Sequence, residues 1–154
     1  MKRRVAVVFG GRSAEHEISV ISARSVIDAL DPDRYEVLAI GVTKDGRWQL
    51  LPAGPPALSA GAAPGALPGV APYPGAEISL DQEPGSQALV AADGSRTRID
   101  VVFPVMHGPY GEDGSIQGFL EMAGVPYVGA GVLASAVGMD KAMQKVLFAA
   151  AGLP

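Results

Sequence analysis

The 154-residue chain has a formal net charge of −4, with 48% hydrophobic residues, two His and no Cys. This length fits one ordinary domain, and the Cys and His counts exclude disulfide frameworks, thiolate zinc sites and multi-histidine metal centres. The acidic balance and scattered Lys and Arg argue against a nucleic-acid surface, and no apolar run suffices for a secretory signal or a membrane span.

The first part of the chain has the pattern of a β-α-β start. Residues 4–9 form a continuous β-branched and aromatic run, which is typical of a strand buried on both faces of a parallel sheet. Two glycines end this run, and Ser13 is expected to cap the helix that follows. Asp31 and Pro32 are expected to end that helix.

A hairpin and an insertion follow this unit. Residues 35–42 and 48–51 have strand-like composition, and the tight turn at 44–47 between them predicts a hairpin. The next stretch, 52–76, is rich in Pro, Gly and Ala and poor in long apolar side chains. We therefore expect a flexible insertion without regular secondary structure.

The second part of the chain repeats the strand and helix pattern. Residues 87–91 and 97–99 flank an Asp-Gly turn and predict a second hairpin. An apolar run at 101–106 predicts another buried strand, which leads into the glycine-rich loop 107–114. The two parts of the chain are therefore interpreted as one fold that the insertion interrupts.

The last elements are two helices with a short strand between them. A helix is expected to begin at Ser115, with Gly124 as the left-handed residue at its end. A short strand at 126–128 follows, and Asp140 then caps a final helix. The whole pattern predicts an α/β fold with an open, mostly parallel sheet flanked by helices.

Ligands of open parallel sheets bind beside the carboxyl ends of the strands. The first loop there, residues 10–17, has neither the G-x-G-x-x-G nor the Walker A spacing, which argues against a nicotinamide or P-loop site. Glu15 in this loop suits a ligand ammonium, while nearby backbone N–H groups suit an anion, so an amino acid matches both. The alternative is that Glu15 and Glu17 only stabilise the helix dipole.

The second loop, 107–114, combines an imidazole, three glycines and two carboxylates after a buried strand. His107 could donate to a substrate carboxylate or transfer a proton near neutral pH, and Gly108 allows backbone to approach a ligand. The alternative is a strand-terminal His bonded to a carbonyl group. His16, inside the first helix, is interpreted as structural or solvated.

Lys141 follows the capping Asp140 at the start of the last helix. A cation there opposes the positive end of the helix dipole, so a bound anion such as a nucleotide phosphate would explain it. A solvated surface lysine is the alternative.

Three sequence blocks together resemble a known enzyme family. They are 8–19, then 107–114 followed by Gln117 and Gly118, and finally 129–141. In this order and at these separations they closely resemble the amino-terminal part of the D-alanine–D-alanine ligases, which belong to the ATP-grasp superfamily.

The resemblance implies an ATP-dependent ligase that makes D-alanyl-D-alanine for peptidoglycan and cell-wall synthesis in the cytoplasm. Such ligases phosphorylate the carboxylate of the first D-alanine, using ATP with Mg²⁺ or Mn²⁺, and the amine of the second attacks the acyl phosphate. By resemblance, Glu15 holds the ammonium of the first D-alanine and His107, with Gly108, lies near its carboxylate. These are the expected catalytic and substrate-binding residues, while Lys141 is expected to contact ATP phosphates.

The resemblance also implies a division of the chain. Residues 1–138 correspond to the substrate-side, Rossmann-like domain that precedes the ATP-grasp domains, and 139–154 to the first helix of a truncated central domain. The family's metal site uses an Asp, a Glu and an Asn, and this chain contains no Asn. We therefore expect no metal site here, no turnover by these residues alone, and the C-terminal ATP-grasp domains as missing partners.

Other interpretations stay open at this point. A self-contained flavodoxin-like domain that binds a small molecule or regulates without catalysis fits the same elements. The family resemblance also implies a homodimer contact in this region. The residues do not decide whether the second substrate is D-alanine, D-lactate or D-serine.

Overall fold

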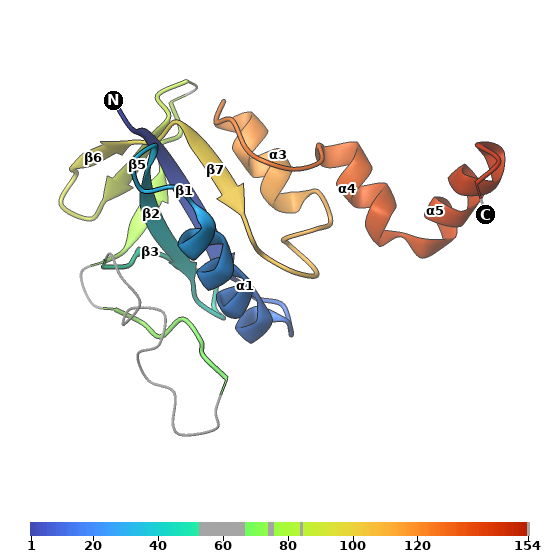
Figure 1. Ribbon diagram of the computed structural model, residues 1–154, viewed down its shortest axis with the longest axis horizontal. Coiled ribbons are helices and arrows are strands. Elements are labelled where there is room, and N and C mark those ends of the chain that lie inside the picture. The colour runs from blue at the N-terminus through green and yellow to red at the C-terminus, as the bar shows by residue number, and fades with distance from the viewer. Residues whose placement is uncertain (53–66, 74–75, 84, 154) are drawn as a thin grey trace.

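The computed structural model in Figure 1 describes residues 1–52, 67–73, 76–83 and 85–153. Most of the predicted insertion lies outside these residues, so its flexibility stays a prediction. No helix in the described part of the chain is long and apolar enough to cross a bilayer.

The main sheet has four strands in the order β3 (Trp48–Leu50), β2 (Tyr35–Val42), β1 (Arg3–Gly10) and β7 (Val101–Pro104). β1 lies between β2 and β7 and runs parallel to both, while β3 pairs antiparallel with β2. The sheet is thus mostly parallel, as expected, and β3 confirms the first hairpin.

A second sheet contains β4 (Ile78–Leu80), β5 (Ala88–Ala91) and β6 (Arg96–Arg98), all antiparallel. The β5–β6 pair confirms the second predicted hairpin. This hairpin pairs with β4 rather than with the parallel strands, and β4 is too short to be evident from sequence alternation.

Two helices of the described part of the chain cover the main sheet, one on each face. α1 (His16–Ala29) begins after Glu15, and the prediction that Ser13 caps it is wrong. The chain instead makes a turn there, in which the His16 N–H donates to the Ser13 carbonyl at 3.3 Å. α3 (Ser115–Met122) forms where its periodicity predicts, and Gly124 behind it has the expected positive φ of 66°.

The remaining helices, α4 (Val132–Met139) and α5 (Lys141–Ala150), extend away from the sheet (Figure 1). The Asp140 carboxylate accepts from the N–H groups of Ala142 at 3.0 Å and Met143 at 3.1 Å, so it caps α5 as predicted. α4 was not expected, because its small and apolar residues lack a capping side chain and a polar face. The predicted strand 126–128 is reduced to one parallel bridge, Val102 with Tyr127.

β1 divides the hydrophobic core into two layers. Its side chains alternate between the faces of the sheet, as the pleat requires. Val5, Val7 and Phe9 pack with residues of α1, whereas Ala6 and Val8 pack with residues of α3. Both faces are fully covered along residues 5–9, which explains why these five residues include no polar side chain.

Substitution of Leu120, which is fully buried on α3, should destabilise the fold. Leu120→Ala removes core contacts and leaves a cavity, so we expect a loss of about 2–5 kcal/mol in the free energy of unfolding. Leu133→Ala on α4, where the side chain is 77% exposed, is the control and should change it by less than about 0.5 kcal/mol. Urea unfolding followed by circular dichroism measures both, and equal effects would contradict this assignment of the core.

Candidate functional site

The strand order places two loops side by side at the carboxyl edge of the sheet. β2 and β7 lie on opposite sides of β1, so β1 and β7 form the point where the direction of chain winding reverses. Ligands of open α/β sheets bind at such a point. The loop after β1 carries Glu15, and the loop after β7 carries His107.

Gly10 allows the chain to leave β1 in the required direction. Its φ is +87°, and a Cβ atom there would lie 2.4 Å from the carbonyl oxygen of Val42. The next N–H, that of Gly11, donates to the same carbonyl at 2.8 Å. Any side chain at Gly10 would therefore displace the loop that carries Glu15.

Two serine hydroxyls join the two loops. The Ser19 Oγ is fully buried, accepts from the Gly10 N–H at 2.8 Å and donates to the Val105 carbonyl at 2.7 Å. The Ser13 Oγ donates to the His107 carbonyl at 2.7 Å and accepts from the Glu15 N–H at 3.1 Å. Each hydroxyl thus uses both its donor and an acceptor lone pair to bridge the β1 end and the β7 end.

The His107 ring is held from two sides. Its Nε2 lies 3.0 Å from the Ser22 Oγ on α1, and its Nδ1 lies 3.6 Å from the Glu112 Oε1. The second oxygen of Glu112 accepts from the Gly108 N–H at 2.8 Å. The bond with Ser22 orients the ring, whereas 3.6 Å is too long for a hydrogen bond and leaves Nδ1 open to a ligand.

Glu15, His107 and Glu112 form one cluster, in which one ligand atom of each residue lies within 4.8 Å of the others. An ammonium that donates to two carboxylate oxygens at about 2.8 Å separates them by about 4.6 Å. The cluster therefore has the spacing and charge to hold an ammonium. The structure brings the expected residues Glu15, His107 and Gly108 together, but the Gly108 N–H is already bound to Glu112.

The rest of the loop 107–114 is stabilised by internal contacts. The Asp113 carboxylate accepts from the N–H groups of Tyr110 and Ser115, both at 2.9 Å. Partial burial acts to raise the pKa of Asp113, but these bonds outweigh it and hold the pKa below its ordinary value. The guanidinium of Arg12 lies 4.9 Å from the Tyr110 ring centroid and links this loop to the one after β1.

His16 has a structural role, in agreement with one of its two interpretations. It is 1% exposed, its Nδ1 lies 2.7 Å from the Gly11 carbonyl oxygen, and its Nε2 accepts from the Val70 N–H at 2.9 Å. Because Nε2 accepts, Nδ1 carries the proton and donates to Gly11. The buried ring thus ties the segment 67–73 to the loop after β1.

Lys141 lies apart from this cluster, on α5. Its Nζ is 3.3 Å from the Gly138 carbonyl oxygen and 3.5 Å from the Gln144 Oε1. These neighbours are acceptors and not the N–H donors that a phosphate requires. The described residues around Lys141 therefore do not form a site that fits ATP or its metal ion.

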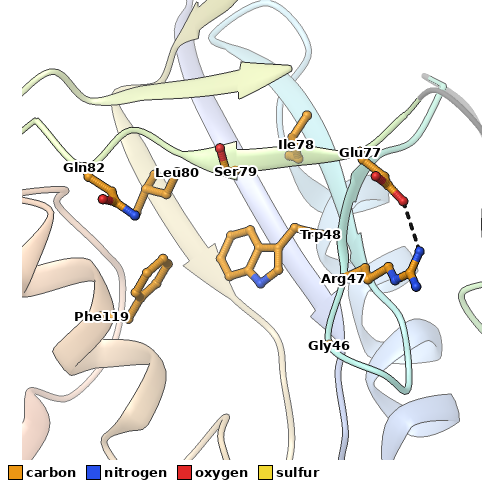
Figure 2. A pocket seen from close by; sticks show the side chains of 9 residues that line it. All are labelled: Gly46, Arg47, Trp48, Glu77, Ile78, Ser79, Leu80, Gln82 and Phe119. Carbon is orange, nitrogen blue, oxygen red and sulfur yellow. Dashed lines mark hydrogen bonds and ion pairs between the residues drawn. The ribbon is translucent and has the colours of Figure 1, made fainter. Parts of the chain in front are cut away.

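A separate hollow of about 430 Å³ lies between β3, β4 and α3. Figure 2 shows the side chains that line it. Trp48 and Phe119 form its aromatic wall, with ring centroids 5.8 Å apart in an edge-to-face arrangement. Arg47 and Glu77 pair at its rim, with 3.3 Å between nitrogen and oxygen. A smaller hollow of about 230 Å³, lined partly by Arg12, Trp48 and Phe119, lies toward the two loops.

Sequence reasoning missed Ser13, Ser19 and Ser22 as the residues that join the loops. The two hydroxyls of α1 lie three positions apart, which places them on one helix face and is the signal that could have identified them. Their partners, Val105 and His107, lie 85 or more positions away in the chain and could not be identified without the fold.

A family model described as the D-ala D-ala ligase N-terminus matches residues 4–130. The D-alanine–D-alanine ligase of Mycolicibacterium vanbaalenii is 55% identical over 156 residues, which cover 98% of this chain and 42% of that protein. The chain thus spans about 42% of the length of this curated relative.

Solved structures show the same similarity. The D-alanine–D-alanine ligase of Coxiella burnetii has a TM-score of 0.80 and 36% identity, covering 99% of this chain and 43% of that one. The VanG D-Ala:D-Ser ligase of Enterococcus faecalis has a TM-score of 0.77 and 30% identity, with the same coverage.

Removal of the Ser19 hydroxyl should destabilise the chain. Ser19→Ala leaves the Gly10 N–H and the Val105 carbonyl without their partner, so we expect a loss of about 1–3 kcal/mol in the free energy of unfolding. Ser25→Ala, at an exposed position of the same helix, is the matched control and should have little effect. Chemical denaturation compares the two, and a Ser19→Ala variant as stable as the control would contradict the bridging role.

Proposed function

Because the chain belongs to the family of D-alanine–D-alanine ligase amino-terminal domains, we propose that it binds the first D-alanine of an ATP-dependent ligation. The product is D-alanyl-D-alanine for peptidoglycan synthesis. One observation carries the proposal: the Glu15 carboxylate and the His107 imidazole meet where β1 and β7 end.

Glu15 is the proposed partner of the substrate ammonium. No hydrogen bond or ion pair in the described part of the chain occupies its carboxylate, so it is free to accept from a ligand. A charge-assisted hydrogen bond between an ammonium and a carboxylate is about twice as strong as a neutral one. Glu112 brings a second negative charge to the same position, which strengthens the preference for a cation.

His107 is the proposed partner of the substrate carboxylate. Ser22 occupies its Nε2, and the open Nδ1 lies on the side of Glu112. An Nδ1–H there would donate to a carboxylate whose ammonium lies against Glu15, so one amino acid bridges both loops. This arrangement orients the carboxylate for reaction while the amine is held.

The nucleotide side of the proposal rests on the sequence resemblance. Lys141 is the proposed phosphate contact, and ATP with Mg²⁺ or Mn²⁺ would need further groups that the described residues do not provide. In the same proposal, 1–138 is the substrate-side domain, 139–154 begins the ATP-grasp central domain, and the remaining ATP-grasp domains are partners. Cytoplasmic location and a homodimer are further parts of it.

The second substrate is left open. The VanG ligase, which matches along nearly all of this chain, is named a D-Ala:D-Ser ligase, whereas the other relatives are named for two D-alanines. D-alanine is the substrate that these names share. We therefore propose D-alanine for the site on this chain and make no choice among D-alanine, D-lactate and D-serine for the second.

Calorimetric titration with D-alanine, without nucleotide, tests the proposed site. We expect D-alanine to bind, and Glu15→Gln to weaken binding about 10- to 100-fold, because a hydrogen bond to a charged group is lost. Glu83→Gln, on the exposed loop after β4, is the control and should bind like the unaltered chain.

Two outcomes would contradict the proposal. One is equal binding of D-alanine by the Glu15→Gln and Glu83→Gln variants. The other is tight binding of flavin or nucleotide without any binding of D-alanine, which would favour a self-contained regulatory domain. In a separate phosphate-release assay, the 154-residue chain should release no phosphate from ATP and D-alanine.

A further inference from the structure

The cluster of Glu15, His107 and Glu112 offers two carboxylates and an imidazole nitrogen around one point. These are ligands of the kind that Zn²⁺ takes in sites with three protein ligands and an open fourth position. Mg²⁺, which prefers an all-oxygen octahedral shell, matches this set poorly.

Two of the three candidate ligands, His107 and Glu112, already have hydrogen bonds that orient them. The Ser22 hydroxyl is bound to the His107 Nε2, and Nδ1 lies on the side of Glu112. The Gly108 N–H holds one oxygen of Glu112 and leaves the other directed to the cluster. Metal-binding histidines and carboxylates commonly have such hydrogen bonds on their far side, which orient them.

The distances within the cluster are close to those of a zinc site. Two ligand atoms on a tetrahedral Zn²⁺ lie about 3.3 Å apart, and the His107 Nδ1 and the Glu112 Oε1 are 3.6 Å apart. A ligand atom of the exposed Glu15 lies within 4.8 Å of one in each of the other two residues, so a movement on the order of 1.5 Å would bring it to zinc-ligand spacing. We propose that Glu15, His107 and Glu112 form a Zn²⁺ site.

The proposed ion and the proposed substrate overlap. Zn²⁺ at this point would neutralise both carboxylates and occupy the position assigned to the D-alanine ammonium. Zinc would therefore compete with D-alanine for the site. This consequence rests on the proposed function, whereas binding of the ion rests only on the cluster.

The composition of the chain makes the site easy to test. It has two histidines and no cysteine. His16 is 1% exposed and both of its ring nitrogens are engaged. An imidazole that binds added metal in the folded chain must therefore be that of His107, and its NMR signals report the event directly.

The experiment is a calorimetric titration of the 154-residue chain with ZnCl₂ in a non-chelating buffer, with NMR of both imidazoles. We expect one Zn²⁺ per chain and a shift of the His107 signals alone. Glu112→Gln and His107→Ala should each weaken binding at least about 10-fold, and Ser22→Ala about 10-fold through loss of its orienting bond. Glu83→Gln should bind like the unaltered chain, and MgCl₂ should leave the His107 signals unchanged.

The proposal is overturned if the unaltered chain binds no Zn²⁺, or if His107→Ala binds it equally well. Equal affinity of the Ser22→Ala variant would overturn the orienting role of Ser22. Circular dichroism of each variant establishes that it is folded. Titration with D-alanine in the absence of Zn²⁺ separates the two proposals, because either ligand can bind if the other does not.

Discussion

The buried Ser19 hydroxyl is the contact on which the geometry of the site depends. It lies on α1, near the ends of β1 and β7. It accepts from the Gly10 N–H at the end of β1 and donates to the Val105 carbonyl just after β7. An unpaired polar group at this depth costs about 1–3 kcal/mol, so the two strand ends can separate only with that loss. Ser13 repeats this connection closer to the surface and joins the backbone of His107 to that of Glu15.

This connection brings together the two loops that carry the proposed binding site. Side chains pack on both faces of β1, and this packing holds the strand in place. Gly10 then turns the chain out of the strand at a position where a Cβ atom would clash with the Val42 carbonyl. The loop after β7 lies against it because of the two serines. The proposed cation site consists of Glu15, Glu112 and His107, whose side chains lie together because backbone and hydroxyl groups hold the two loops.

Local features of the sequence explain how far prediction succeeds. The apolar run of β1, the periodicity of α3 and the Asp140 cap are signals within a few residues, and each forms as expected. Residues that follow strand ends were expected at the ligand-binding edge, and Glu15 and His107 do meet there. The serine bridges could not be predicted, because they join positions 85 to 94 residues apart. The cap assigned to Ser13 was wrong because α1 begins only after Glu15, so the Ser13 hydroxyl accepts from the Glu15 N–H ahead of the helix and donates to the distant His107 carbonyl.

Amide hydrogen exchange at Gly10 tests the central claim, that a buried hydroxyl holds the end of β1, most directly. Its N–H donates to the Ser19 Oγ, and neither group reaches solvent without opening the contact between β1, α1 and β7. The account predicts that the exchange rate of this amide lies within about 10-fold of that of the slowest β1 amides. The reason is that it exchanges only through an opening whose free energy is close to that of global unfolding. Exchange at the rate of an unprotected loop amide, in a chain whose β1 core remains protected, would contradict it.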